Sequence, residues 1–385
     1  MDRLELTITI FTIILISFII FPFSYYFIGK QQVDRLNQTP IYRDIRFIIP
    51  CFTYTILLGY RYNYAYDWYQ YQQTFIYLLT GRLYREDTEI GYLAINWILG
   101  QLGFSYYSIF ILEGFIWIFA ICFICKEYRK AWIFILPLMY IVFKFRCLNI
   151  SRQFFSMSIF LIAFKHLLNG HNIKYWILGG VAFLIHSAAI IYVVPLYFIK
   201  KFIKYPPIIV TLSIYAILFI FQNQIQDFLF HQVEFITTNI ITNKGDDYYT
   251  YDNLTDKFAW EQRSIIRRLF QASKDILYIF FIYKLKDTNI LSQQQKTIFY
   301  IGFISIFAAT AMGENEISTR LIIYITMFYY IGWGLIYYYA LSYPQRLVPI
   351  WYKLISIFIL CHYIYSFYES IITEVNLGVY LEYRI

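Results

Sequence analysis

Arginines stand at the start of three predicted helices. Ser151 precedes Arg152, Thr319 precedes Arg320, and the segment "EQRSIIRRLF" brings Arg263, Arg267 and Arg268. Ser and Thr favour N-cap positions, where free backbone N–H groups and the positive end of the helix dipole already attract an anion. A cation at such a position opposes the dipole unless an anion is also present. The pattern therefore predicts a site for a phosphate-bearing ligand, and salt bridges to Glu261, Glu314 or Glu316 are the alternative.

The stretch "FKFRCLNISRQFF", residues 143 to 155, gathers three charges in an otherwise apolar run: Lys144, Arg146 and Arg152. On insertion scales a charged side chain at the bilayer centre costs roughly 2.5 to 3.5 kcal/mol. We therefore expect these three side chains at a membrane surface or beside a wet cavity.

Two acids lie among aromatic residues. They are Asp67, in "GYRYNYAYDWYQYQQTF" (59 to 75), and Glu89, in "REDTEIGY" (85 to 92). Most of these rings fit an aromatic belt at the membrane interface. Aromatic faces beside a carboxylate also suit sugar binding. An acid on a partly dry surface has a raised pKa and can act as a general base when it reaches the proton to be removed, so both acids are catalytic candidates.

His186, in "AFLIHSAAI", interrupts an apolar run and precedes small residues. It fits a hydrogen-bonded structural residue as well as a third catalytic candidate. Glu113, in "FILEGFIW", is an acid in the middle of a predicted span, and such acids are functional candidates by default. Glu113 and Glu316 are reserve candidates. The sequence has no P-loop, G-x-G-x-x-G or G-x-S-x-G motif and no metal-ligand constellation, so no metal, nucleotide or other cofactor is expected.

The composition is that of an integral membrane protein. Of the 385 residues 59% are hydrophobic and only 15% are charged, and the mean hydropathy is +0.52. Apolar runs recur from residue 4 to residue 370, which predicts one polytopic domain over residues 1 to 385. The net charge of +8 reports mainly cytoplasmic lysines and arginines. Membrane lipid and phosphate are therefore the expected partners, and nucleic acid is not.

These features predict an all-α bundle of about twelve transmembrane helices, for which a GT-C-like arrangement is one option. The predicted spans lie near residues 4 to 28, 45 to 60, 104 to 125, 131 to 148, 152 to 169, 174 to 186, 187 to 200, 206 to 222, 264 to 284, 297 to 311, 319 to 341 and 350 to 370. Two assignments decide the topology. Residues 90 to 103 form a short interfacial or re-entrant helix that does not cross, and residues 174 to 200 turn back at His186.

With these two assignments the Lys-rich connections share one side, which the positive-inside rule identifies as the cytoplasm. Residues 61 to 103, the 143 to 152 turn, a loop at about 223 to 263 and both termini then face the opposite side. Basic residues on that side are mainly arginines. Their planar fork suits bidentate phosphate binding, whereas the Lys ammonium suits contact with lipid head groups.

The pattern resembles the EpsG/Wzy-type family of bacterial polysaccharide polymerases. The matching segments are "YAYDWYQY", "TEIGYLAINWIL", "ISRQFFSMSIFLIAFKHL", "FLIHSAAIIYVVPLYF" and "STRLIIYI", which together cover most of residues 60 to 330. The resemblance implies an inner-membrane glycosyltransferase that joins undecaprenyl-diphosphate-linked oligosaccharide repeats at the periplasmic face, as in O-antigen or lipopolysaccharide synthesis. Asp67, Glu89 and His186 would be catalytic. Arg146, Arg152, Arg267 and Arg320 would bind the diphosphate.

The lipid-linked oligosaccharide would serve as donor and as acceptor, and a chain-length regulator and a flippase are further candidate partners. Two other functions stay open. A flippase for lipid-linked oligosaccharides would spread its cations through the membrane depth and show repeated halves, whereas here the arginines gather at one rim. An O-antigen ligase would share the lipid donor and differ mainly in its acceptor.

Overall fold

The computed structural model describes residues 3–24, 39–64, 67–85, 88–200, 203–225, 228, 265–286, 290–312, 316–342 and 350–376. Every regular element among them is helical, which confirms the predicted all-α class for this part of the chain. The chain divides into two compact units, which are described separately. Unit 1 comprises Met1–Phe198 and Gly334–Ile385, and unit 2 comprises Ile199–Trp333.

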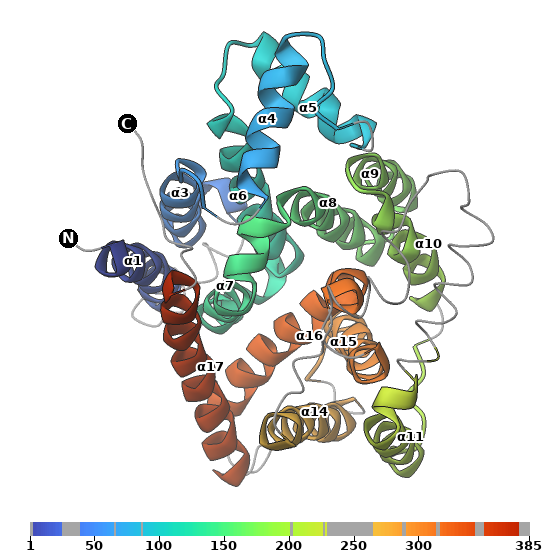
Figure 1. The fold of residues 1–385 in the computed structure, drawn as a ribbon. Coiled ribbons are helices and arrows are strands. Elements are labelled where there is room, and N and C mark those ends of the chain that lie inside the picture. The colour runs from blue at the N-terminus through green and yellow to red at the C-terminus, as the bar shows by residue number, and fades with distance from the viewer. Residues whose placement is uncertain are drawn as a thin grey trace. The chain divides into compact units, whose positions relative to one another are not determined.

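Unit 1 holds most of the helices, and many of them are seen end-on in Figure 1. They are α1 (Arg3–Phe23), η2 (Ile41–Arg43), α3 (Ile45–Gly59), α4 (Trp68–Leu79), α5 (Ile90–Gln101), α6 (Tyr107–Ile124), η3 (Lys126–Ala131), α7 (Trp132–Asn149), α8 (Ser151–Leu168), α9 (Asn172–Ile185), η4 (Ser187–Ala189), α10 (Ile190–Ile199), the end of α16 (Glu316–Ser342) and α17 (Ile350–Asn376). Helix α6 packs between α3 and α8, and α1 packs on α3 and α7.

Six stretches in the described part of the chain are long and apolar enough to cross a membrane: Arg3–Phe23, Tyr107–Ile124, Lys126–Asn149, Gln293–Met312, Thr319–Ser342 and Ile350–Asn376. Four shorter apolar helices accompany them: Ile45–Gly59, Asn172–Ile185, Ser187–Ile199 and Ile208–Ile220. These helices coincide with predicted spans, so the membrane class is confirmed. The count of about twelve crossings and the GT-C-like arrangement stay predictions.

The apolar run around His186 breaks where the sequence predicts. His186 has an extended backbone, with φ −154° and ψ 116°, between α9 and the short η4 helix. Beyond the break the chain turns back on itself: the Tyr175 hydroxyl of α9 donates to the Val193 carbonyl of α10 at 2.6 Å. Gly179 of α9 also packs against the Val193 side chain. Helices α9 and α10 therefore form an antiparallel pair.

Several Lys- and Arg-containing connections of unit 1 meet at one end of its helices, as the positive-inside argument expects. Asp44 is fully buried before α3 and accepts hydrogen bonds from Arg46 Nε at 2.7 Å and from Arg129 Nη1 at 2.8 Å. Lys165 of α8 pairs with Glu127 of η3 at the same end. We call this end of the unit 1 helices the opposite end, because it lies away from the end described next. The end that holds residues 60 to 64, Asp67, Glu89, Ile150 and His186 is called the site end.

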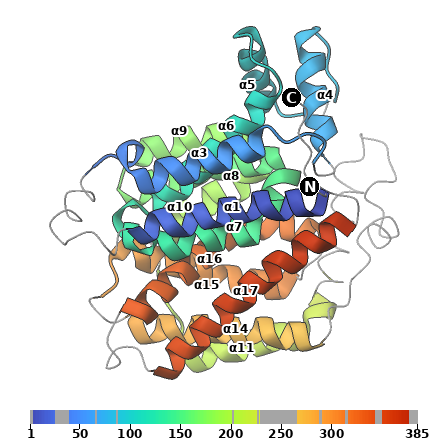
Figure 2. The ribbon, with the colours of Figure 1, turned by 90° about the vertical axis from the view of Figure 1, so that its left-hand side faces the viewer.

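Helices α4 and α5 form a lateral arm at the site end. The Tyr71 and Tyr92 ring centroids lie 6.0 Å apart near the starts of the two helices, and Gly100 packs against Leu79 near their ends, so the helices run parallel. Figure 2 shows both helices running crosswise to α1, α3 and α7. Each has 12 residues, or about 18 Å of helix, which is too short to cross a hydrocarbon core of about 30 Å.

Unit 2 is built from α11 (Ile208–Ile220), α14 (Ile265–Leu285), α15 (Gln293–Met312) and the first part of α16. Its centre is a buried acid. Asp275 accepts hydrogen bonds from the hydroxyls of Tyr215 and Tyr329, at 3.0 and 2.8 Å, and from the Gln271 amide at 3.0 Å. This carboxylate ties α11, α14 and α16 together.

Candidate functional site

Three of the predicted site residues meet at the site end of unit 1. Glu89 lies between the other two: its Oε1 is 2.8 Å from His186 Nδ1 and its Oε2 is 2.7 Å from Arg152 Nη1. The backbone N–H of Ser187 also donates to Oε1 at 3.3 Å. The Arg152 contact is off the hydrogen-bonding direction, so it is an ion pair without a well-aligned hydrogen bond. One carboxylate thus joins the starts of α5 and α8 to the break after α9.

The cluster is partly open to the surface. The side chains of Glu89, Arg152 and His186 are 18%, 21% and 22% exposed, so all three can meet a ligand. Burial alone would raise the pKa of the Glu89 carboxyl, but the His186 hydrogen bond and the Arg152 charge together lower it below its ordinary value. Glu89 is therefore ionised at neutral pH. The sequence-based expectation of a raised pKa does not hold for this acid, because a cation and a hydrogen-bond donor face it directly.

A buried aromatic and aliphatic cluster beneath the site holds these residues in place. It comprises Trp68, Tyr92, Ile109, Phe110, Phe155 and Ile185. Trp68 and Ile185 are direct chain neighbours of Asp67 and His186, whereas Tyr92 and Phe155 follow Glu89 and Arg152 by about one helical turn. Packing of these apolar side chains therefore fixes where the polar ones emerge, and the sequence shows this as aromatic residues next to each candidate.

The helix starts that meet at this site are those of α4, α5 and α8, whereas two of the three arginine-bearing starts that the sequence singles out, those of α14 and α16, belong to unit 2. Asp67 is the N-cap of α4 and Glu89 is the N-cap of α5, and neither side chain caps its own helix. The Asp67 N–H donates to the Asn149 side chain at 3.2 Å, which brings the start of α4 to the junction of α7 and α8. Three helix N-termini thus converge there, and their dipoles favour an anion.

The predicted Ser and Thr caps are wrong. Ile150 is the N-cap of α8, and Ser151, its first residue, donates to the Cys147 carbonyl at 3.2 Å. The turn between α7 and α8 is a single residue, which leaves no room for Ser151 outside the helix. Helix α16 begins at Glu316, so Thr319 lies within its first turn.

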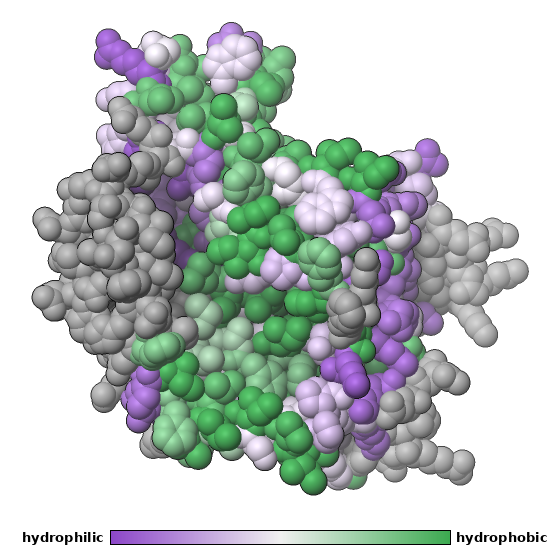
Figure 3. Space-filling model, turned by 90° about the vertical axis from the view of Figure 1, so that its right-hand side faces the viewer, coloured by the Kyte–Doolittle hydropathy of each residue, from purple (hydrophilic) through white to green (hydrophobic). Residues whose placement is uncertain are grey.

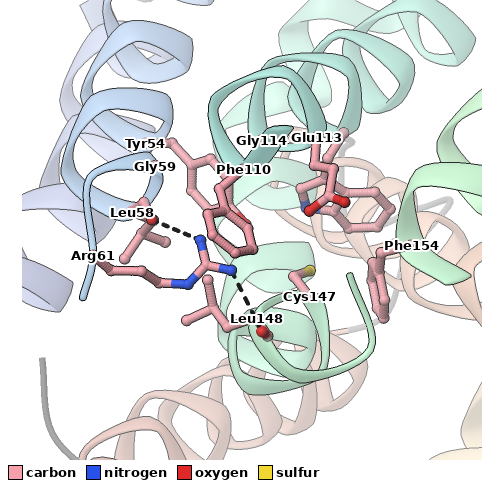
Figure 4. A pocket seen from close by; sticks show the side chains of 11 residues that line it. Tyr54, Leu58, Gly59, Arg61, Phe110, Glu113, Gly114, Cys147, Leu148 and Phe154 are labelled. Atoms are coloured by element: carbon pink, nitrogen blue, oxygen red, sulfur yellow. Dashed lines mark hydrogen bonds between the residues drawn. The ribbon is translucent and has the colours of Figure 1, made fainter. Parts of the chain in front are cut away.

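Glu113, a reserve candidate, lines a separate small cavity behind the cluster, of about 20 Å³, together with Arg61 (Figure 4). That volume holds about one water molecule. The Arg61 guanidinium is buried, donates to the Leu58 carbonyl at 2.7 Å and stacks 4.3 Å from the centroid of the Phe110 ring. Glu113 accepts from the Tyr92 hydroxyl at 3.4 Å. Arg61 and Glu113 are both buried in one lining, so each charge offsets the cost of burying the other.

Sequence reasoning did not single out Arg61. A signal was present, because one cation directly follows the apolar helix α3 in "GYRYNY" and a neighbouring helix carries a lone intramembrane acid. Pairing the two requires knowing that α3 packs on α6, and the sequence does not state this.

The other candidates lie elsewhere. The Arg146 side chain is exposed on α7, outside the Glu89–Arg152–His186 cluster, and Arg320 is exposed on the unit 2 part of α16. Lys144 is not at a surface or wet cavity as predicted: it is buried, donates to Ser370 Oγ of α17 at 2.7 Å and lies over the rings of Phe145 and Phe367. The side chains of Arg267 and Glu316, the acids Glu261 and Glu314, and the predicted 223 to 263 loop beyond residue 228 lie outside the described residues.

Comparison with known proteins adds one match. Residues 44–383 match the family model described as the EpsG family. This range includes every residue of the cluster and of the cavity behind it. No curated protein and no solved structure matches the chain significantly.

Proposed function

The chain belongs to the EpsG family, and we propose that it is a glycosyltransferase that joins undecaprenyl-diphosphate-linked oligosaccharide repeats into a surface polysaccharide at the periplasmic face of the inner membrane. Family membership supports a membrane polysaccharide polymerase or a glycosyltransferase-like role. The observation that carries the finer proposal is the contact of Glu89 with both His186 and Arg152 at one end of the unit 1 helices. Through this contact Glu89 joins His186, the proposed base, to Arg152, the cation that would bind an anion.

In this proposal His186 is the general base. An ionised carboxylate only accepts hydrogen bonds, so the 2.8 Å contact with Glu89 places the imidazole proton on Nδ1 and leaves Nε2 as the proton acceptor. Glu89 thus orients the ring and stabilises the imidazolium that forms. The predicted catalytic set then has distinct roles, with Glu89 positioning His186. Asp67, at the start of α4, remains a candidate to bind the acceptor sugar.

Arg152 and the three helix N-termini would stabilise the leaving group. The acceptor hydroxyl oxygen attacks the anomeric carbon of the donor sugar as the bond from that carbon to the diphosphate oxygen breaks. The electron pair leaves with the undecaprenyl diphosphate and the hydroxyl proton goes to His186 Nε2. Negative charge grows on the departing diphosphate, where a fixed guanidinium and backbone N–H groups act most strongly. The lipid diphosphate is already an activated donor, so no nucleotide enters.

The decisive experiment uses purified protein in nanodiscs with undecaprenyl-diphosphate-linked repeats as the only sugar source. Products longer than one repeat, formed by the wild type and not by His186→Ala, would support the polymerase. Absence of any longer product with correctly folded protein would contradict it. In cells, a polymerase deletion leaves one repeat on each lipid core, whereas a ligase or flippase deletion leaves none.

A further inference from the structure

The lateral arm exposes an apolar stripe that no part of the described chain covers. The exposed residues Ile90, Trp97 and Ile98 of α5, and Leu102 at its C-cap, follow helical spacing and are 70%, 50%, 50% and 66% exposed. The polar Asn96, by contrast, is buried and donates to the Tyr92 carbonyl at 2.8 Å. Helix α5 therefore turns its apolar face outward. A contiguous exposed face of this kind indicates an interaction surface.

The position of the arm indicates what meets this surface. The arm runs crosswise to the spanning helices α1 and α7 and extends sideways past them (Figure 2). In that view α5 lies nearer the middle of the spanning helices, and α4 lies nearer their site end. A helix that leaves the side of a membrane bundle at this level lies beside lipid.

The surface of α5 continues onto a helix that itself faces outward. Gly91 packs directly against the backbone of Leu184 in α9, and α9 exposes Ile177 and Leu184 by 62% and 47%. Figure 3 shows hydrophobic residues over much of the visible face of the arm and hydrophilic ones at its outer corner. The apolar stripe of α5 thus extends an apolar face of the membrane helices.

Helix α4 is more polar than α5, as expected if α4 lies closer to the membrane surface. Its sequence "WYQYQQTFIYLL" carries three glutamines and three tyrosines, and Tyr69 is 55% exposed. Glutamine and tyrosine are suited to the head-group layer, where Tyr rings concentrate. An arm with one apolar and one amphipathic helix, stacked in this order, is the arrangement expected of an element lying in the membrane interface.

We propose that the lateral arm lies in the membrane interface, with the α5 stripe against the acyl chains of the outer part of the bilayer and α4 in the head-group layer. Asp67 and Glu89 begin α4 and α5, so the arm fixes the Glu89 cluster at the boundary between the head groups and the acyl chains. This binding surface does not depend on the proposed glycosyltransferase reaction.

The test compares two matched positions on the full-length protein in phosphatidylcholine nanodiscs. Ile98→Cys on α5 and Tyr69→Cys on α4 replace side chains that are 50% and 55% exposed. Each is made in a Cys361→Ser background, since Cys361 is an exposed native thiol, and is labelled with a bimane fluorophore. Residual labelling of the background is subtracted, and Trp97→Cys repeats the test one residue along the stripe.

The label at Ile98 should be quenched several-fold more by doxyl-labelled lipid than the label at Tyr69, and aqueous iodide should show the reverse order. Equal quenching at both positions, or the opposite order, would overturn the proposal. A third outcome would also overturn it: a label at Ile98 shielded from both quenchers, with disulfide crosslinking between Ile98→Cys copies, would assign the stripe to a second copy of the chain. Unchanged melting temperatures of the variants exclude misfolding as the cause.

Discussion

Oε2 of Glu89 lies 2.7 Å from Nη1 of Arg152, although the two residues begin different helices. In the described structure the Arg152 guanidinium is therefore already balanced by a carboxylate. An arriving diphosphate would meet a cation that Glu89 has positioned at the start of α8. The pair with Glu89 uses a single guanidinium nitrogen, so the planar fork would come into use only when a phosphate group binds.

Arg152→Lys should reduce polymer formation, and Arg152→Ala should reduce it further, by about 2.7–4 kcal/mol in transition-state stabilisation, or roughly 10²–10³-fold. Lysine keeps the charge and loses the fork. The measurement is polymer formed per folded protein on purified lipid-linked repeats. Arg43, exposed at the opposite end, supplies the control Arg43→Ala. Full activity of Arg152→Lys would contradict a phosphate fork, and unchanged activity of Arg152→Ala would remove Arg152 from the reaction.

The Glu89 ion pair should make stability depend on acid pH. The pKa of Glu89 is lowered in the folded state. Its contribution to the free energy of unfolding is therefore fully present above the unfolded-state pKa of about 4.3 and disappears as the pH falls through the folded-state pKa. The wild type should therefore melt at a higher temperature than Glu89→Gln at neutral pH, and the gap should close on acidification below about pH 4.3. Melting curves across this range test it. A gap independent of pH would mean that the Glu89 charge contributes nothing.

Gly91→Ala should separate the arm from α9. A Cβ at position 91 would lie 2.6 Å from the backbone carbon and oxygen of Leu184, which cannot rotate away. Overpacking of this kind costs about 1–3 kcal/mol, and here it pushes Glu89 from His186. Gly180→Ala is the matched control, because nothing lies within 4 Å of its Cβ. We expect a lower melting temperature and lost activity for the first variant only, and equal behaviour of the two would refute this packing.

Substitution of Arg61 should reduce the amount of folded protein, whereas Glu113→Gln should leave activity per folded molecule unchanged. Arg61→Met removes the donors to the Leu58 and Leu148 carbonyls and the cation that shares a cavity lining with Glu113, and each buried acceptor left unsatisfied costs about 1–3 kcal/mol. Little folded protein should remain. Glu113→Gln keeps a polar partner for the Tyr92 hydroxyl and should retain activity per folded molecule. If Glu113→Gln alone abolished activity at normal protein levels, Glu113 would replace His186 as the base.

The site end should face the periplasm. Lys174→Cys, at the opposite end near the start of α9, should react with a membrane-impermeant maleimide only after the cells are opened. Lys244→Cys, in the predicted 223 to 263 loop, should react in intact cells. Reaction of Lys244→Cys only in opened cells would reverse the predicted topology and move the active face to the cytoplasm.

The sequence predicts individual elements better than the contacts between them. Interruption of an apolar run by His186 and small residues locates the turn between α9 and α10, since few other arrangements bury both halves. The short apolar run at residues 90 to 103 likewise predicts a helix that does not cross, and α5 has 12 residues. These features depend on local composition, and local composition is fully visible in the sequence.

The pairing of Glu89 with Arg152 and His186 could not be predicted, because it depends on how α5, α8 and α9 pack. The sequence identifies each residue as unusual for its surroundings but does not identify its partner. Lys144 shows the same limit. Its burial against Ser370 requires α17 to lie beside α7, a contact between segments far apart in the chain.

The buried Asp44 at the opposite end has a consequence for biosynthesis. Its bonds to Arg46, at 2.5 and 2.7 Å, come from a residue two positions away, so this acid–base pair needs no distant part of the chain and can form once the start of α3 has been made. Arg129 is translated much later, after α6, and can only then donate to the same carboxylate. A helix that enters the bilayer with its charges already matched avoids most of the insertion cost of an isolated ion. Asp44 can therefore be neutralised within the start of α3 before Arg129 is made, and in the folded chain it also holds the connection that follows α6.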